Sequence, residues 1–219
     1  ADRLGVIDDK AEFLHPNKIL VLLYYYLMRY RGWRGAAVRN LATTHLLDRI
    51  AEDFGETCYE VPVGFKYVSA KMVETGAIIG GESSGGLTVR GHIQGKDGIY
   101  AAALLVEAIA KTGRRLSALW DEITQKYGAA EMAEHDFHFS SAERTRIFKL
   151  LMEDKHLPEF PCEIAKVSYM DGCKVYFKNG GWVIARFSGT EPLLRVFCEM
   201  DTMENAEKFA KILTEFLSL

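Results

Sequence analysis

The chain has 219 residues, of which 48% are hydrophobic and 26% are charged, and its formal net charge is −3. This composition is typical of a globular protein that is long enough to bury its own core. The acidic balance argues against a nucleic-acid-binding protein, which needs a basic surface to neutralise phosphates. The most apolar stretch, residues 19–28, is shorter than the roughly 20 residues that a membrane-spanning helix needs. We therefore expect no nucleic acid and no membrane among the partners of this chain.

Four cysteines are spread along the chain without a C-x-x-C pair: Cys58, Cys162, Cys173 and Cys198. This spacing favours reduced core thiols of a cytoplasmic protein over a zinc site or a disulfide framework. The sequence starts at Ala1 with neither an initiator Met nor a signal peptide, and we expect a fragment of a larger cytoplasmic protein.

The first 127 residues alternate short apolar segments with helical patterns. Pro16 suits the first turn of a helix, Gly32 and Gly55 suit helix ends, and Asp97 suits a helix N-cap. The alternation predicts an α/β fold for residues 1–127, with a mostly parallel sheet between two helical layers, that is, a three-layer α/β/α domain. The expected elements, in chain order, are a strand at 4–7, a helix at 16–31, a strand at 36–41, a helix from Thr43 or Thr44 to 54, a strand at 57–61, a helix at 66–75, a strand at 77–79, a polar excursion at 88–95, and helices at 97–111 and 116–127.

Residues 128–134 are small and polar, and we interpret them as a linker. The order of elements then changes, and Asp171-Gly172 and Asn179-Gly180 are typical hairpin turns. This pattern predicts a second, α+β domain over residues 135–219, with a small antiparallel sheet and helices on one face. Its expected elements are a strand at 137–139, a helix at 142–152, strands at 166–169, 174–178, 182–187 and 193–200, and a terminal helix at 205–217.

A glycine-rich segment, Gly80-Gly81-Glu82-Ser83-Ser84-Gly85-Gly86, follows the strand expected at 77–79. In open α/β sheets, ligands bind at the carboxyl ends of strands. One carboxylate and two hydroxyls suit a hydroxyl-rich ligand such as a sugar, because Glu accepts hydrogen bonds from a diol and Ser both donates and accepts. A flexible, solvated turn is an equally good interpretation of the composition alone. The spacing does not fit the G-x-G-x-x-G dinucleotide fingerprint.

A second polar loop, Arg186-Phe187-Ser188-Gly189-Thr190-Glu191-Pro192, separates two apolar strands. Arg supplies paired donors to an anion, Ser and Thr supply hydroxyl donors, and Gly lets backbone N–H groups come close. Such a set suits a phosphate dianion. An ordinary hairpin loop with a surface Arg has about the same weight on composition alone.

Three weaker candidates remain. Lys66 opens a helix and could face an anion, although a solvated lysine at a helix end is the better interpretation of one such residue. His92 with Lys96 could act on a ligand, but a lone His is more often structural. Asp97 is explained by its role as a helix cap alone.

Together these motifs resemble the α-D-phosphohexomutase superfamily of phosphoglucomutases and phosphomannomutases, over nearly the whole chain and in the family's order. Ala1-Asp2-Arg3 is similar to the tail of the Asp-x-Asp-x-Asp-Arg metal loop, so the resemblance implies that Asp2 is a partial metal site and that Arg3 lies next to it. Gly64-Phe65-Lys66-Tyr67 resembles the family's Gly-Phe/Trp-Lys segment, which implies that Lys66 binds substrate. Glu82 and Ser84 match the Gly-Glu-x-Ser-Gly sugar loop.

The later motifs resemble the family in the same way. His92, Lys96 and Asp97 match a His-Ile-x-x-Lys/Arg-Asp-Gly segment, which implies that His92 and Lys96 bind substrate. The loop after the strand at 182–187 matches Arg-x-Ser-Gly-Thr-Glu-Pro, the family's phosphate-binding loop. The implied phosphate-binding residues are Arg186, Ser188, Gly189 and Thr190.

The sequence also departs from the family pattern. Ser83 stands where a second Glu is common, and Phe187 stands where Pro is frequent. Gly86 stands where several phosphomannomutases and phosphoglucosamine mutases have His, which tilts the expected substrate toward glucose phosphates.

The resemblance implies a four-domain enzyme of which this chain holds the third domain and the fourth, a small domain resembling the TATA-binding-protein fold. The catalytic phosphoserine and most of the Mg²⁺ site would then lie in preceding domains, and no catalytic residue would lie on this chain. We therefore expect the sugar- and phosphate-binding part of an isomerase that interconverts hexose 1-phosphate and 6-phosphate through a bisphosphorylated hexose. The alternatives are a phosphomannomutase, a phosphoglucosamine mutase, or a non-catalytic sugar-phosphate-binding module.

Overall fold

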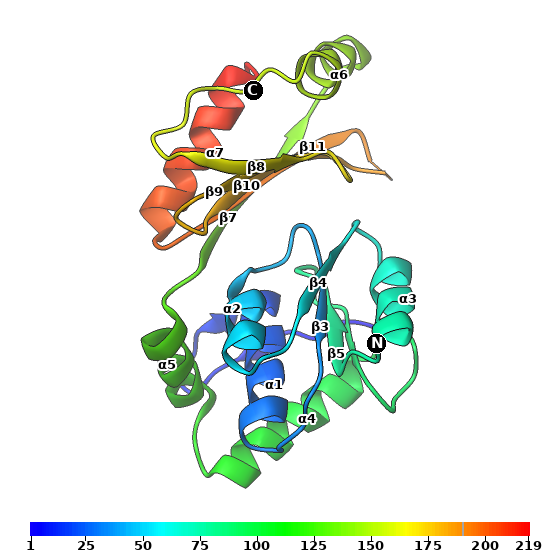
Figure 1. Cartoon of the computed structure of the whole chain (residues 1–219), viewed down its shortest axis with the longest axis vertical. Helices are drawn as coiled ribbons and strands as arrows, with labels where there is room; N and C mark the ends of the chain where they lie inside the picture. The colour runs from blue at the N-terminus through cyan, green and yellow to red at the C-terminus, as the bar shows by residue number, and fades with distance from the viewer. Residues whose placement is uncertain (190) are drawn as a thin grey trace. The chain divides into compact units, whose positions relative to one another are not determined.

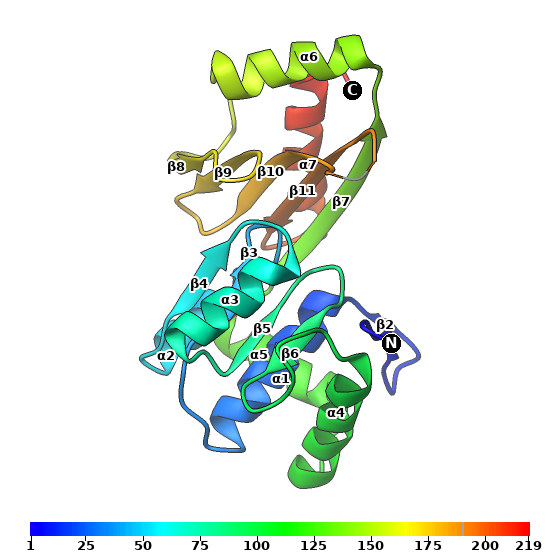
Figure 2. The same ribbon diagram turned by 90° about the vertical axis from the view of Figure 1, so that its right-hand side faces the viewer.

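The computed structural model describes residues 1–189 and 191–219, and these form two compact units, Ala1–Gly128 and Ala129–Leu219 (Figures 1 and 2). Each unit has its own sheet and its own helices. The α/β class expected from the sequence is confirmed for the first unit, and the antiparallel sheet with helices is confirmed for the second.

The first unit is built on a four-stranded sheet with the order β4-β3-β5-β6. β3 (Ala37–Asn40) runs parallel to β4 (Cys58–Val61) and to β5 (Ile79–Gly81), whereas β6 (Leu87–Val89) is antiparallel to β5. The carboxyl ends of the three parallel strands therefore meet at one edge of the sheet, which is the edge where α/β proteins bind ligands.

Helices cover both faces of this sheet, as Figures 1 and 2 show. α3 (Phe65–Thr75) packs on one face, where Val68 and Met72 join the apolar residues of β3 and β4. On the other face, residues 19–28 of α1 are all buried, as expected of a core helix too short to span a membrane. The helices of this unit are α1 (Pro16–Arg29), α2 (Leu46–Asp53), α3, α4 (Gly98–Thr112) and α5 (Leu116–Tyr127).

Gly80 lies inside β5 rather than in a loop, which corrects the sequence-based assignment of the strand to residues 77–79. A Cβ at Gly80 would lie 2.4 Å from Met72 Sδ and 2.6 Å from Val68 Cγ1. The helix α3 therefore lies directly on the strand backbone, and this close packing requires glycine at that position.

The second unit has a five-stranded antiparallel sheet with the order β7-β11-β10-β9-β8. Successive side chains along each strand point to opposite faces of this sheet. Val175, Val183 and Val196 point into a core that also takes Ile147 from α6 and Phe209 from α7. The elements are β7 (Glu131–His138), α6 (Ser141–Phe148), the π-helical turn η1 (Lys149–Glu153), β8 (Ile164–Ser168), β9 (Cys173–Phe177), β10 (Trp182–Phe187), β11 (Leu193–Met200) and α7 (Met203–Phe216).

Three sequence-based assignments are wrong in detail. β7 begins at Glu131, so half of the segment interpreted as a linker is an edge strand paired with β11. The polar excursion expected after residue 87 contains β6. The strand expected at 4–7 is reduced to β1 (Val6–Ile7), which forms a two-stranded hairpin with the unpredicted β2 (Phe13–Leu14). These strands were missed because they are short or because charged residues interrupt them.

Several capping predictions are confirmed. Asp97 caps α4, and its Oδ1 accepts hydrogen bonds from the backbone N–H groups of Ile99 and Tyr100. Pro16 occupies the first turn of α1.

All four cysteines have free thiols. Within residues 1–189 and 191–219, no helix is long and apolar enough to cross a membrane.

Candidate functional site

The segment expected to bind a sugar forms a hairpin loop at the carboxyl end of β5. Gly81 pairs with Leu87 at the ends of β5 and β6, and the loop spans residues 82–86. Glu82 N donates to Gly86 O over 2.9 Å, and Gly85 N donates to Glu82 O over 3.0 Å. The loop is therefore closed by its own backbone rather than being an open, solvated turn.

Glu82 is the anchor of this loop, because its side chain is only 7% exposed. Its Oε1 accepts from Asn40 Nδ2 over 3.1 Å and from Gly64 N over 3.0 Å. Asn40 ends β3 and Gly64 caps α3, so one carboxylate oxygen ties three segments together at the ligand-binding edge of the sheet. The other oxygen, Oε2, makes no hydrogen bond with the described residues and stays available as an acceptor.

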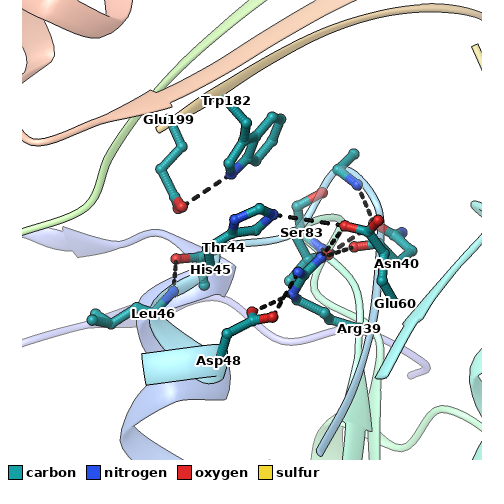
Figure 3. Close-up of polar contacts among 12 residues, drawn as sticks. Arg39, Asn40, Thr44, His45, Leu46, Asp48, Glu60, Ser83, Trp182 and Glu199 are labelled. Atoms are coloured by element: carbon teal, nitrogen blue, oxygen red, sulfur yellow. Dashed lines mark hydrogen bonds and ion pairs between the residues drawn. The ribbon is translucent and has the colours of Figure 1, made fainter. Parts of the chain in front are cut away.

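A second layer of hydrogen bonds fixes the residues around Glu82, and Figure 3 labels Asn40 and Ser83 of this layer. Asn40 Oδ1 accepts from Ala42 N and from Thr43 Oγ1, each over 2.9 Å. Thr43 Oγ1 in turn accepts from Ser83 N over 3.0 Å. The start of the loop is thus hydrogen-bonded to the segment that follows β3.

Next to Asn40 lies a buried ionic cluster that Figure 3 also shows. Arg39 is 3% exposed, and its Nε and Nη2 donate to Asp48 over 2.7 and 2.9 Å while Nη1 donates to Glu60 over 2.6 Å. His45 Nε2 lies 3.6 Å from Glu60 Oε2. A fully paired buried cation of this kind fixes the backbone at the end of β3, because breaking either partner leaves a charge without compensation.

The charges in this cluster reinforce one another. Burial alone would lower the pKa of Arg39, but the carboxylates outweigh burial and the pKa is raised well above its ordinary value. Burial likewise opposes ionisation of Asp48, yet the Arg39 guanidinium outweighs burial and lowers the pKa of Asp48. Both groups are therefore charged at neutral pH.

Lys66 lies in the first turn of α3 and is exposed. Its Nζ lies 4.8 Å from the ring centroid of Tyr67, and no ion pair involves it among the described residues. Its neighbour Gly64 contacts the Glu82 loop directly. Lys66 is thus a cation at the same sheet edge as Glu82 whose charge the described residues leave uncompensated.

Lys96 joins the N-terminal segment to the Glu82 loop. Its Nζ lies 2.7 Å from Asp2 Oδ2, and the Lys96 hydrogen bond and charge hold the pKa of Asp2 below its usual value. The neighbouring residue Arg3 is exposed, and its carbonyl lies against the start of α4 at Gly98. The structure therefore brings together two residues and one loop that the sequence singled out separately, namely Asp2, Lys96 and the Glu82 loop.

His92 has partners within its own segment. Its Nε2 lies 2.8 Å from Asp97 Oδ2, and its ring stacks on Tyr100 with centroids 4.0 Å apart. The hydrogen bond from His92 is the main cause that lowers the pKa of Asp97. His92 also lines a cavity of about 270 Å³ between α3 and the 90–94 segment, away from the Glu82 side chain. Ser84, by contrast, is exposed at the loop tip and makes no hydrogen bond with the described residues.

The second predicted site lies at the end of β10, in the second unit. Arg186 Nε donates to Asp171 Oδ2 over 2.9 Å, and the guanidinium makes no other hydrogen bond with the described residues. Asp171 lies in the hairpin turn between β8 and β9, and its neighbour Gly172 has φ 96°. A Cβ at Gly172 would come within 2.6 Å of Ala185 O, so glycine lets this turn approach the β10 backbone. The turn holds Arg186 through Nε and leaves both Nη groups for a ligand.

The loop that follows Arg186 is open. Ser188 N donates to Leu193 O over 2.8 Å and closes the base of the loop. Gly189 is exposed, a Cβ there would meet nothing within 4 Å, and its φ is not positive. Neither packing nor conformation therefore requires glycine at this position. Thr190, the remaining residue predicted for this loop, lies outside the described residues.

Arg195 is a site residue that the sequence analysis missed. It lies directly opposite Arg186 in the β10–β11 pair, so both side chains project from the same face. Its Nη2 donates to Glu191 Oε2 over 3.2 Å, while its buried Nε has no hydrogen-bond partner among the described residues and lies 3.7 Å from Asp136 Oδ1. The period-2 pattern of β11, which puts a charged residue two positions after Leu193, is the signal that could have revealed it.

The described residues of this chain do not form a magnesium site by themselves. In residues 1–189 and 191–219, no group of three or more His, Cys, Asp or Glu side chains is placed to hold a metal ion. Asp2, the residue expected to contribute one ligand, binds the Lys96 ammonium. The described residues therefore do not fit a metal by themselves, and the role of Asp2 as one metal ligand stays a prediction.

Comparisons with known proteins match both units. The family model for phosphoglucomutase/phosphomannomutase, alpha/beta/alpha domain III, matches residues 15–127, and the model for the C-terminal domain of the same family matches residues 149–215. A phosphoglucomutase/phosphomannomutase of Thermococcus kodakarensis is 32% identical over 214 residues, which cover 97% of this chain and 44% of the relative. A phosphoglucomutase of Komagataeibacter xylinus is 28% identical, over 98% of this chain and 41% of the relative.

Solved structures show the same fold. A phosphoglucomutase/phosphomannomutase family protein of Burkholderia thailandensis superposes with a TM-score of 0.77 at 23% identity, over 99% of this chain and 45% of that protein. An N-acetylphosphoglucosamine mutase of Aspergillus fumigatus, solved with GlcNAc-6P and magnesium, superposes with a TM-score of 0.60 at 16% identity, over 98% of this chain and 50% of that protein.

The fold is thus an α/β/α layer unit followed by an antiparallel α+β unit, each carrying a polar loop at the end of a strand. The chain belongs to the phosphoglucomutase/phosphomannomutase family. It spans less than half the length of the curated relatives described above.

Proposed function

We propose that this chain is the sugar- and phosphate-binding part of a phosphohexose mutase, an isomerase that interconverts hexose 1-phosphate and hexose 6-phosphate. The observation that carries the proposal is the pair Arg186 and Arg195, whose side chains lie on one face beside the open loop at Gly189. Two guanidinium groups and a loop with accessible backbone suit a phosphate dianion. Membership of the mutase family supports this assignment.

The sugar would be held by the other loop. Glu82 Oε2 is free of hydrogen bonds with the described residues, and Ser84 is exposed at the loop tip, so both can bond hydroxyl groups. Lys66 adds an uncompensated cation at the same edge. In the proposed reaction, the Glu82 loop holds the sugar and the Arg186 loop holds the phosphate that is not reacting.

The chemical step would belong to a phosphoserine outside this chain. It would give its phosphoryl group to the substrate and so form a bisphosphorylated hexose. After this intermediate has reversed its orientation in the site, its other phosphate would return to the serine. Catalysis of phosphoryl transfer depends on positioning and on stabilisation of charge, which are the tasks that these loops can perform. Mg²⁺ would act mainly with residues that precede Ala1, in a cytoplasmic enzyme. We propose glucose phosphates as substrates, because Gly86 gives the loop no bulky side chain.

Ligand titration tests the proposal directly. Amide chemical shifts of the chain are followed during titration with glucose 1-phosphate, mannose 1-phosphate, glucosamine 1-phosphate and inorganic phosphate. We expect glucose 1-phosphate to perturb residues of both loops and inorganic phosphate to perturb only the Arg186 loop. Perturbation of neither loop by any hexose phosphate, at concentrations where inorganic phosphate binds, contradicts the proposal.

An activity assay separates the mutase from a non-catalytic binding module. The purified 219-residue chain should not interconvert glucose 1-phosphate and glucose 6-phosphate, because no phosphoserine is assigned to it. The chain joined to its preceding domains should do so. Turnover by the isolated chain would show that the nucleophile was wrongly placed.

A further inference from the structure

Lys96 connects three segments that surround the Glu82 loop. It lies between β6 and α4, and its Nζ reaches Asp2 Oδ2 over 2.7 Å. The same ammonium lies 6.0 Å from the ring centroid of Phe65, at the start of α3. Its methylene stem passes directly over the backbone of Gly86, the last residue of the loop.

Gly86 is the residue that makes room for this stem. A Cβ built on Gly86 would lie 2.1 Å from Lys96 Cδ and 2.8 Å from Cγ, which is far closer than van der Waals contact. These atoms are in the middle of the side chain, so moving them would also move Nζ away from Asp2. Gly86 has no positive φ, in contrast to its neighbour Gly85 with φ 93°. The conformation of the backbone therefore permits other residues at 86, and the lysine stem is what excludes them.

The Asp2 segment is fixed at its other side as well. Gly98 N donates to Ala1 O over 3.0 Å, and a Cβ at Gly98 would lie 2.3 Å from Arg3 O. The N-terminal segment is thus packed against the first turn of α4, while Lys96 connects it to the loop. These contacts link the start of α4 to Gly86 through Asp2 and Lys96.

We propose that Gly86 and Lys96 form one coupled positioning pair, in which the glycine provides the path of the lysine stem and the lysine ammonium holds the Asp2 segment against the sugar loop. In this arrangement Lys96 acts as a positioning residue, because Gly86 sets the path of its stem and its ammonium is held at Asp2. Lys66 is then the lysine of this edge that is available to an anionic ligand. The role of the pair in substrate binding rests on the proposed function, whereas the coupling itself does not.

A double-mutant cycle on the chain tests the coupling. Scanning calorimetry measures the Tm of the first unit in the wild type, Gly86→Ala, Lys96→Ala and the double variant. We expect Gly86→Ala to lower the Tm by about 3 °C or more, as overpacking does, and to lower it by less than half as much when Lys96 is already Ala. An equal loss in both backgrounds overturns the proposal.

Two further variants separate the stem from the charge. Lys96→Met keeps most of the stem and removes the ammonium, so Gly86→Ala should remain costly in the Lys96→Met background. Lys96→Arg keeps a cation and should retain the wild-type Tm. Gly5→Ala is the matched control within the first unit, because Gly5 has no positive φ and a Cβ there would meet only Phe13 Cε2 at 3.6 Å, an ordinary contact, so the Tm should stay unchanged.

A binding readout tests the positioning role. Gly86→Ala and Lys96→Met should each weaken glucose 1-phosphate binding by roughly threefold to tenfold, and the double variant should be no weaker than the worse single one. Lys96→Arg should restore binding. If Lys96→Met weakens binding while Gly86→Ala leaves it unchanged, Lys96 is a direct ligand and the positioning role is wrong. If the wild type binds no hexose phosphate, the proposed function fails, and the Tm cycle still decides the coupling.

Discussion

The two candidate loops differ in how many of their polar groups already form hydrogen bonds within the protein. Glu82 is nearly buried, and one of its carboxylate oxygens already accepts two hydrogen bonds from its own chain. Among the described residues, Arg186 is held by a single hydrogen bond through Nε, and at Gly189, three residues later, a Cβ would meet no atom within 4 Å. The first loop is preorganised by internal contacts, whereas the second is held at its base and open at its tip.

This difference suits the two ligands that we assign to the loops. Hydroxyl groups on a sugar differ only in orientation, so a site that distinguishes them needs acceptors fixed in space. A phosphate dianion carries a strong charge and several equivalent oxygens, so a pair of cations and accessible N–H groups can bind it with less internal support. Substitutions should therefore affect stability most in the first unit and ligand binding most in the second.

The largest effect is expected for Arg39→Met, which removes the buried cation behind the Glu82 loop. Asp48 and Glu60, which are partly exposed, would lose the guanidinium between them, at a cost of about 3 kcal/mol in the free energy of unfolding, the low end of the range for a broken buried ion pair. Urea denaturation measures this value. Arg115→Met is the matched control, because the Arg115 side chain is 78% exposed and its loss should cost less than about 1 kcal/mol. If the two variants lose the same free energy of unfolding, Arg39 does not support the loop.

Arg186→Ala should act on binding and leave folding nearly intact. In the chain joined to its preceding domains, we expect a raised KM and a kcat/KM lowered by the equivalent of about 2–4 kcal/mol, the scale of a charged hydrogen bond at a buried partner. Steady-state kinetics with glucose 1-phosphate measure the loss. Unchanged kinetics would refute the role that we assign to Arg186.

Two substitutions of Glu82 test the roles of its two carboxylate oxygens separately. Glu82→Ala leaves Asn40 Nδ2 and Gly64 N without their acceptor and should cost about 1–3 kcal/mol of stability. Glu82→Gln keeps an oxygen at that position, so it should preserve most of the stability while weakening sugar binding. Urea denaturation and ligand titration distinguish the two variants. A stable Glu82→Ala variant would show that the anchor is dispensable.

Acid should destabilise the first unit through Asp48. The folded-state pKa of Asp48 is lowered from its usual value near 3.8, so its ionised form stabilises the fold above that pH. This contribution is lost as the pH falls below 3.8 and through the folded-state pKa, because the unfolded chain then binds the proton more readily. Urea denaturation at pH 7, 4 and 3 should show the loss. The Asp48→Asn variant should be less stable at pH 7 and show a weaker dependence on pH.

The smallest effect on stability is expected for Gly189→Ala. A Cβ at this position meets no atom within 4 Å, so the free energy of unfolding should change by less than about 0.5 kcal/mol. Binding of inorganic phosphate should nevertheless weaken, because the methyl group would obstruct the approach of the anion to the backbone. Unchanged phosphate affinity would place the anion elsewhere.

Much of the fold could be predicted from local patterns in the sequence. α5, β10 and β11 lie at the expected residues, since each is a sustained periodic segment with clear ends. β7 could not be found in this way, because its charged residues conceal the strand and its pairing with β11 defines it. Gly80 was assigned to a loop for a related reason, since the packing of α3 on β5 is a tertiary contact.

The candidate site was predictable as a set of residue types and not as a set of contacts. The two loops were visible as polar segments at strand ends. Asn40 and Glu82 are 42 positions apart in the sequence, so the anchoring of Glu82 depends on a tertiary contact. The juxtaposition of Arg186 and Arg195 depends on the register between β10 and β11. Neither follows from local composition. The pairing of Lys96 with Asp2 was likewise hidden, although both residues had been singled out.

The pairing of β7 with β11 has a consequence for how the second unit folds. β7 is the first strand of this unit and β11 is the last, so the sheet is completed only when both ends of the unit are present. Closing so long a loop is entropically costly and slows folding. During synthesis, β8, β9 and β10 can pair as local hairpins, but the strand that carries Arg195 must emerge before β7 can join them. We therefore expect the Arg186–Arg195 pair to assemble late, in the same step that closes the sheet.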